Sequence, residues 1–429
     1  MCRPALPSGE VSPAPQLQKE DEWIETFDVQ KFTEEIQALG DKLEKQQGDA
    51  DVAHLQKMVL WSNLCGIVGL LTMGICVNPV SVFLLSCFTF SRWTMIAHHT
   101  CHGGYDKLHP NKRWNRFRFG VGSGWRRFCD WLDWMMPEAW NVEHNNRHHY
   151  NLSEVEDPDL VEENLSDIRE MDVPLFVKYM AIPFVMVTWK WFYYAPNTYK
   201  ELKLAMLRRK GTPIPEGVKP QEAVTVRVLL TSGTVFFSLW EFLTVVIGPY
   251  FLFRFIVTPA PLFLLGPYLG MPYMYSNAVK SLVLSELLTN AHAFLMVVTN
   301  HAGDDMYRFG SSCRPFSGSF FMRQVGASVD YAYGTDLIDF LHGYLNYQIE
   351  HHLWPALSMK SYQKAAPLVK EICQRHGIPY VQQGCFKRLK KTIDIMTGTT
   401  SMRVFPKEYE RKYLELDAIA EAKKYKKKN

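Results

Sequence analysis

The strongest constraint on this chain is a stretch of twenty residues, 58–77, that contains no charged side chain. It reads "MVLWSNLCGIVGLLTMGICV" and has the length that an α-helix needs to cross the hydrocarbon core of a bilayer. Asn78 and Pro79 interrupt it, and a second apolar stretch, "VSVFLLSCFTFSRWTMIA", follows. We therefore expect two membrane helices joined by a short turn, so that the chain returns to the side from which it started.

A second apolar block, 226–270, predicts another pair of membrane helices, although Glu241 and Arg254 interrupt its apolar pattern. The stretches 173–194 and 279–300 are apolar but carry charged side chains, and we expect both to lie along the membrane surface or partly embedded in it. The predicted fold class is all-α integral membrane, with about four transmembrane helices in two hairpins and a cytosolic helical cap. The alternative is a soluble helical protein with very apolar core helices.

Three parts are expected along the chain: a cytosolic N-terminal arm over 1–55, a membrane domain with its cytosolic cap over 56–390, and a basic cytosolic C-terminal tail over 391–429. The mixed-charge segment 30–49 has helical periodicity, which predicts an amphipathic helix or a loose arm. Two hairpins return the chain to one side. The basic segment 107–127 and the tail then lie in the cytosol by the positive-inside tendency.

Composition excludes several classes of protein. The formal net charge of +3 gives no strong field, so no nucleic-acid partner is expected. The nine cysteines are scattered and form no CxxC pair, which predicts reduced thiols and neither a disulfide framework nor a zinc site. The sequence contains no HPGG haem-binding motif and no Gly-rich nucleotide fingerprint after a strand. Electrons for any redox chemistry are therefore expected from outside the chain.

Twelve of the fourteen histidines lie between residues 98 and 352, and eight of these form the clusters "HHTCH", "HNNRHH" and "QIEHH". Residues four apart share one face of a helix, so His98 can point at the same centre as His102, and His144 at the same centre as His148. Imidazole suits iron, zinc, copper and nickel, and about eight imidazoles exceed what one tetrahedral zinc uses. The clusters therefore predict two metal ions. A membrane protein that binds zinc only structurally is the alternative, and metal analysis separates the two.

The HxxxH, HxxxHH and QxxHH boxes, interleaved with apolar hairpins, resemble the membrane fatty-acid desaturase family over residues 58–385. Gln348, where other branches place a histidine, resembles the front-end branch, which acts between an existing double bond and the carboxyl end of the chain. The segments "HGYLNYQIEHHLWP" and "GIPY" resemble the same branch. Two features depart from it, and they bear on substrate class and regiochemistry. His99 replaces a usual aspartate, and three residues separate the second-box histidines where that branch more often has two.

The resemblance implies a histidine-ligated di-iron centre and no catalytic residue beyond it. The implied iron ligands are His98, His102, His144, His148, His149, His301, His351 and His352. Further candidates, as ligands or as groups that support them, are Gln348, His99, His292, His342, Asp157 and Glu350. The two acids are candidates because a ligating histidine usually donates its second ring N–H to a carboxylate or carbonyl, and ordinary solvated acids are the alternative for both. His342 is also readily explained as an ordinary hydrogen-bonding residue.

The resemblance further implies an O2-dependent enzyme that introduces a double bond into the acyl chain of a lipid or an acyl-CoA. A lipid hydroxylase, another oxidation by the same iron site, or a sphingolipid desaturase is the alternative. The aromatic segment 131–140, "WLDWMMPEAW", is a candidate wall of the acyl-chain tunnel or a set of interfacial anchors. Chain length, double-bond position and carrier are left open.

The expected electron donor is cytochrome b5 with its NADH-dependent reductase. Arg113, Arg116 and Arg118 in the basic segment are candidates to dock an acidic donor, and anionic lipid headgroups are the alternative partner for them. The final residues, "KKKN", resemble a dilysine retrieval signal. They predict a multi-pass protein of the endoplasmic-reticulum membrane with both termini cytosolic. A plastid protein that takes electrons from ferredoxin is the competing prediction, which the acidic N-terminal region disfavours.

Overall fold

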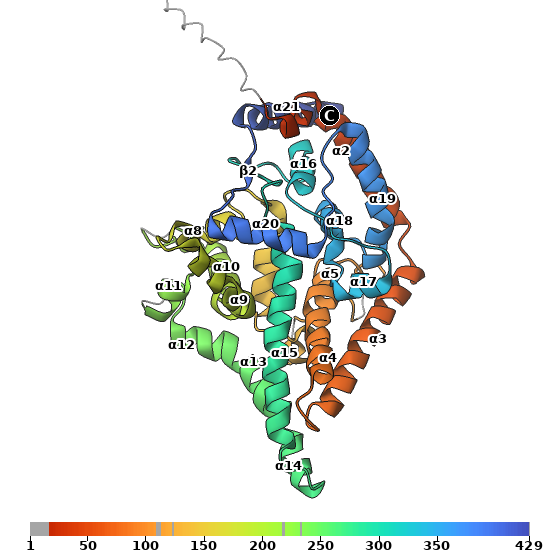
Figure 1. The fold of residues 1–429 in the computed structure, drawn as a ribbon. Helices are drawn as coiled ribbons and strands as arrows, with labels where there is room; N and C mark the ends of the chain where they lie inside the picture. The colour runs from red at the N-terminus through yellow and green to blue at the C-terminus, as the bar shows by residue number, and fades with distance from the viewer. Residues whose placement is uncertain (1–16, 109–112, 122–123, 217–218, 232–233, 429) are drawn as a thin grey trace, which may run out of the picture.

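The structure is a computed structural model that describes residues 17–108, 113–121, 124–216, 219–231 and 234–428. Over these residues the fold is almost entirely helical (Figure 1), and the only named strands are β1 (Tyr307–Arg308) and β2 (Arg403–Val404), which pair in parallel. The prediction of an all-α fold is confirmed.

The first predicted hairpin is present. It consists of α3 (Asp49–Thr72) and α4 (Pro79–Phe90), which pack side by side. The Asn78 side chain accepts a hydrogen bond from the Ser81 N–H at 2.8 Å, and Pro79 occupies the first helical turn, so this turn caps α4 as its sequence predicts. The helix continues through the π-helical segment η2 (Ser91–Ala97) into α5 (His98–Cys101), which delivers the first histidine box to one end of the hairpin.

The second hairpin differs from the prediction. The block 226–270 holds one long helix and not a pair, and the stretch 279–300 is not a surface helix but the other half of the hairpin. One charge from each stretch is neutralised by the other, because Arg254 Nε donates to Glu286 Oε1 at 2.7 Å in the interior. The elements concerned are α11 (Val226–Thr231), the continuous helix Leu239–Tyr268, which includes α12 (Leu239–Glu241), α13 (Gly248–Leu252) and α14 (Ala260–Tyr268), and α15 (Met274–Val297).

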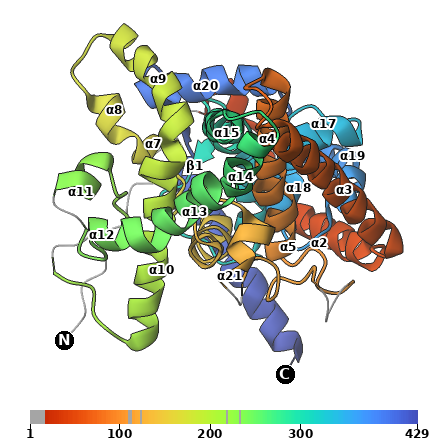
Figure 2. The same cartoon turned by 90° about the horizontal axis from the view of Figure 1, so that it is seen from below.

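A fifth long helix, Leu175–Lys210, crosses the others. It comprises α9 (Leu175–Trp189), the π-helical η6 (Lys190–Tyr194) and α10 (Ala195–Lys210). Figure 1 shows it nearly end-on, whereas Figure 2 shows it lengthwise, so it runs across the direction of α4 and α15. This orientation favours the surface-lying position predicted for 173–194. Five helices in the described part of the chain are long and apolar enough to span a membrane, and the chain is a multi-pass membrane protein.

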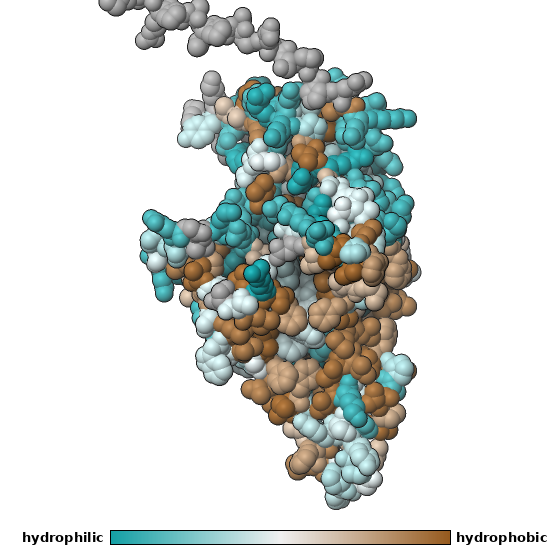
Figure 3. Space-filling view, turned by 60° about the vertical axis from the view of Figure 1, so that its left-hand side comes forward, coloured by the Kyte–Doolittle hydropathy of each residue, from teal (hydrophilic) through white to brown (hydrophobic). Residues whose placement is uncertain are grey.

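The remaining helices form a cap at one end of the membrane helices. Figure 3 shows the division on one face, with a hydrophilic surface over the cap and a hydrophobic surface below it. The predicted amphipathic helix of the arm is confirmed, because α2 (Val29–Lys45) buries one apolar face that includes Phe32 and Ile36. The cap contains α2 (Val29–Lys45), α16 (Gly318–Gly326), α18 (Gln348–Leu353), α19 (Met359–His376), α20 (Cys385–Thr397) and α21 (Lys407–Lys428).

Both described ends of the chain lie on the cap side (Figure 1), as two hairpins require. α21 is docked there, since the Tyr413 hydroxyl donates to the Ile24 carbonyl and Arg323 Nη2 donates to Glu410 Oε1 at 3.0 Å. The domain boundaries at 55 and 390 stay predictions, and α3 and α20 run across them. Residues 1–16 of the arm and Asn429 of the "KKKN" ending lie outside the described residues.

Candidate metal centre

The cap and the upper ends of the membrane helices bring eight of the predicted histidines together in two groups. In each group, one nitrogen from every ring lies within 4.8 Å of the others, and all the rings are buried. The first box comes from α5, the second from the π-helical η4 (Asn141–Asn145) and the 3-10 turn η5 (His148–Tyr150), and the third from α18. The first group contains His98, His102, His144, His149 and His351, and the second contains His148, His301 and His352.

The second group has the donor chemistry of a cation site. His301 Nδ1 lies 3.1 Å from the Ala327 carbonyl, and a carbonyl can only accept, so Nδ1 carries the proton and Nε2 carries a lone pair. His352 has the same tautomer, because its Nδ1 donates to Gln324 Oε1 at 3.1 Å. The two Nε2 atoms nevertheless face each other at 3.2 Å. Two lone pairs cannot form a hydrogen bond with each other, so this arrangement fits a cation shared by the two rings.

His148 completes this group through an acidic partner. Its Nδ1 lies 2.9 Å from Asp157 Oδ1, and the other Asp157 oxygen accepts from the Ser153 N–H at 2.8 Å. The carboxylate fixes the ring with its Nε2 directed at the group, which is how ligating histidines are usually held. The predicted orienting role thus matches the position of Asp157.

The first group converges in the same way. His98 donates from Nδ1 to the Thr94 carbonyl at 3.1 Å, and its Nε2 lies 3.1 Å from His144 Nε2. His149 Nε2 lies 3.2 Å from His144 Nε2 and 3.1 Å from His351 Nε2. The Nε2 atom of His102 is buried with no hydrogen-bond partner among the described residues. Because buried polar atoms are nearly always satisfied, this orphaned nitrogen also fits a metal ion.

The protonation states agree with this arrangement. Burial lowers the pKa of His144, His149 and His352 well below the ordinary imidazole value, and neighbouring imidazoles lower it further. These rings are neutral at physiological pH, which is the form that binds metal ions. Burial acts on His148 as well, but the Asp157 carboxylate outweighs it and raises the pKa of His148.

The remaining candidate ligands divide into near and distant residues. Gln348 is near, since its Nε2 lies 2.8 Å from His301 Nε2. His99 is buried beside the first group, and its Nδ1 donates to the Met95 carbonyl at 2.7 Å. His292 lies outside both groups, stacked on Phe90 at 3.9 Å between ring centroids. His342 donates to the Ile338 carbonyl of its own helix turn and also lies outside.

Glu350 does not take the orienting role proposed for it. Its Oε1 accepts a hydrogen bond from the Tyr380 hydroxyl at 3.1 Å, and burial raises its pKa well above the ordinary value, as does the neighbouring Asp330. The helix explains this, because positions 348, 351 and 352 share one face of α18 and position 350 lies on another.

Three supporting residues were not predicted. Tyr362 has its hydroxyl 3.4 Å from His351 Nδ1, and Gln324 accepts from His352. Asp159 has a carboxylate oxygen within 4.8 Å of ring nitrogens of His144 and His148. The sequence signal for Asp159 is the acid-rich "EVEDPD" that follows the second box, whereas the other two come from distant segments without a local motif.

The basic segment offers less free charge than its sequence indicates. Arg113 is bonded to Asp130, and Arg116 is bonded to Asp106. Both cations are therefore already paired with carboxylates, which weakens their case as docking residues for an acidic donor. For Arg118 the donor-docking role stays a prediction.

An apolar cavity of about 450 Å³ leads to both histidine groups. Its wall includes His98, His144, His148 and His301 from the groups, and Phe294 and Val297 from α15. Of the aromatic segment 131–140, Trp140 belongs to this wall, while Trp131 and Trp134 are buried elsewhere. None of the three is an interfacial anchor.

A second, more polar cavity of about 670 Å³ reaches the histidines from the cap. His102, His149 and His352 line its inner end, and the exposed Phe117 and Phe316 stand at its outer edge. The two groups are thus accessible from two separate spaces, one apolar and one polar.

The protein-family model described as fatty acid desaturase matches residues 75–384. The chain belongs to the fatty acid desaturase family. The matched range contains all three histidine boxes.

Curated desaturases match this chain over shorter segments. The Delta(5) fatty acid desaturase A of Dictyostelium discoideum is 26% identical over 25% of this chain and 24% of its own length. The Delta(8)-fatty-acid desaturase 1 of Arabidopsis thaliana is 29% identical over 27% of this chain and 24% of its own. The acyl-lipid (9-3)-desaturase of Borago officinalis is 30% identical over 20% of this chain and 19% of its own length. The matches thus span about a quarter or less of these relatives, and no solved structure matches.

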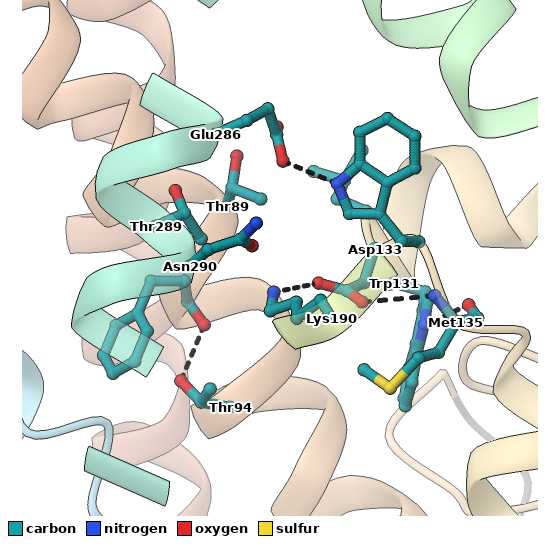
Figure 4. Close-up of polar contacts among 12 residues, drawn as sticks. Thr89, Thr94, Trp131, Asp133, Met135, Lys190, Glu286, Thr289 and Asn290 are labelled. Carbon is teal, nitrogen blue, oxygen red and sulfur yellow. Dashed lines mark hydrogen bonds and ion pairs between the residues drawn. The ribbon is translucent and has the colours of Figure 1, made fainter. Parts of the chain in front are cut away.

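Trp93, five residues before His98, lines the apolar cavity. The Lys190 ammonium lies 4.3 Å from the centre of the Trp93 ring and is bonded to Asp133 (Figure 4). Both charged side chains are fully buried. Asp133 also accepts from the Met135 N–H at 3.2 Å, so the ion pair connects the loop at Asp133 to η6. A buried charge is costly unless it is paired, and here each charge neutralises the other.

Proposed function

We propose that this chain is an O2-dependent acyl-chain desaturase of the front-end type, with two iron ions held by the eight histidines of the two groups. The observation that carries the proposal is the pair of Nε2 lone pairs on His301 and His352 that face each other at 3.2 Å. The conversion takes an acyl –CH2–CH2– unit, O2, two electrons and two protons to –CH=CH– and two water molecules.

The metal ions, when reduced, supply the O2-derived oxidant that an unactivated C–H bond requires. The chain's own residues fix the geometry. Asp157, Gln324 and Tyr362 hold ring tautomers, and the apolar cavity presents one part of an acyl chain to the histidines while excluding water. Gln348 contacts His301, and we propose that it supports this ligand or binds the metal weakly.

The electrons are proposed to come from cytochrome b5 and its NADH-dependent reductase. The polar cavity on the cap supports this, because it leads from an exposed edge with Phe117 to His102, His149 and His352. A donor that docks there reaches the histidines without crossing the acyl-chain cavity. We further propose the endoplasmic-reticulum membrane as the location, with the cap and both termini in the cytosol.

Expression in yeast tests the activity. Cells fed a panel of unsaturated fatty acids are analysed by chromatography of total acyl chains, with His351→Ala as the inactive variant and His342→Ala as the matched control outside the groups. A new double bond on the carboxyl side of an existing one, absent only in His351→Ala, supports the proposal. An oxygenated acyl product would assign the site to hydroxylation. No altered lipid from a well-folded protein would contradict the proposal.

A further inference from the structure

The outer part of the apolar cavity is edged by exposed apolar side chains. Phe184 of α9 and Leu230 of α11 line it, and they are 65% and 57% exposed. On the neighbouring surface Met180 and Trp240 are 76% and 75% exposed. Figure 3, which brings this side of the molecule forward, shows the hydrophobic surface continuing below the hydrophilic cap. In a membrane protein such a surface contacts lipid, so the cavity opens sideways toward the bilayer.

Few basic side chains are available at this opening. The segment 161–172, which includes α7 (Val161–Asn164) and α8 (Ser166–Glu170), lines the cavity with Val161, Asn164, Leu165 and Ile168, and its one arginine lies outside the lining. That arginine, Arg169, donates to Glu162 at 3.1 Å and to the Thr400 carbonyl at 3.2 Å. Apart from histidines, the one basic residue among the described residues that line the cavity is Arg227 of α11, which is exposed.

This charge distribution separates two classes of acyl carrier. A coenzyme A thioester carries a diphosphate and a phosphomonoester, and a single arginine in the lining leaves most of the charge of such a polyanion unpaired. A glycerophospholipid carries one phosphodiester in its headgroup, and its acyl chains already lie in the bilayer at the level of the opening. One guanidinium suits one phosphate, since it offers paired N–H donors in a fixed fork.

We propose that the acyl chain reaches the histidines as part of a membrane glycerophospholipid, entering sideways between α9 and α11 with its phosphodiester at Arg227. This inference rests on the proposed desaturase function and names the carrier of its substrate. It assigns to Arg227 a binding role at the membrane surface, away from the reacting carbons.

The test uses the full chain in lipid nanodiscs with cytochrome b5, its reductase and NADH. The acyl chain is the one that the yeast feeding experiment shows to be converted. In one arm this chain is esterified in phosphatidylcholine of the nanodisc, and in the other it is added as its coenzyme A thioester to nanodiscs of saturated lipid. We expect product on phosphatidylcholine and at least tenfold less on the thioester. Equal or faster conversion of the thioester would overturn the carrier assignment, whereas no conversion in the feeding experiment would be a failure of the proposed function.

Variants of the arginine give a second readout. Arg227→Ala should raise the KM for the phospholipid about tenfold with little change in kcat, and Arg227→Lys should restore part of the loss. Arg208→Ala, on an exposed position of α10 outside the cavity wall, is the matched control and should leave KM unchanged. An unchanged KM in Arg227→Ala would overturn the role of this residue.

Discussion

Asp157 Oδ1 lies 2.9 Å from His148 Nδ1, and both side chains are buried. This contact directs the free nitrogen of His148 at His301 and His352. The second histidine box thereby meets two imidazoles, those of His301 and His352, that lie far along the chain.

Replacement of the Asp157 carboxylate by an amide is expected to weaken metal binding without leaving a cavity. Asp157→Asn keeps the size of the side chain but leaves a neutral amide opposite His148. Partners of this kind typically contribute 10- to 100-fold to metal affinity or activity, so we expect a loss of about that size in turnover and in bound metal. Glu156→Gln, one residue away and bonded to Arg147 and Gln221, is the control. Equal activity of Asp157→Asn and wild type would refute the orienting role.

The two groups predict a partial loss of metal when one of them is damaged. His301→Ala removes a nitrogen from the second group only, so the purified variant should hold about one metal ion per chain where the wild type holds two. His342→Ala should keep both, because its ring bonds to its own helix turn. Elemental analysis of matched preparations measures the ratio. Loss of both ions in His301→Ala, with the fold intact, would show that the groups are not separate sites.

Removal of metal should destabilise the protein, since ions that bind only the folded state stabilise it by mass action. A strong chelator is expected to lower the melting temperature in detergent, and added Fe²⁺ should restore it. In the variant His98→Ala/His301→Ala, which damages both groups, the chelator should have little further effect. A melting temperature that is insensitive to chelator in the wild type would contradict a structural link between metal and fold.

The Lys190–Asp133 pair predicts strong coupling between its two members. Asp133→Asn leaves a buried ammonium without its carboxylate, and breaking a buried pair in this way costs about 3–5 kcal/mol of unfolding free energy. The double variant Lys190→Met/Asp133→Leu removes both charges and should recover most of that loss. The exposed pair of Glu35 and Arg375 serves as control, and Glu35→Gln should cost less than about 1 kcal/mol. Additive effects of the two buried substitutions would exclude the coupling.

Local sequence patterns predict the first hairpin and the histidine boxes. The i, i+4 spacing of His98 and His102 and the uncharged run after Met58 act within one or two helix turns, and both predictions agree with the structure. The second hairpin was misplaced because Arg254 and Glu286 neutralise each other across two helices, which no local pattern reveals. Local patterns also fail to distinguish Asp157 from Glu350. Both acids lie near a histidine box, and the tertiary packing decides that Asp157 contacts an imidazole while Glu350 contacts Tyr380.

The central claim is that eight histidines hold two iron ions, and metal analysis of the purified, active protein tests it most directly. The account predicts two iron ions per chain and no stoichiometric zinc, with loss of metal in the variant His98→Ala/His301→Ala. One zinc ion per chain, or a metal content that does not change in that variant, would contradict it.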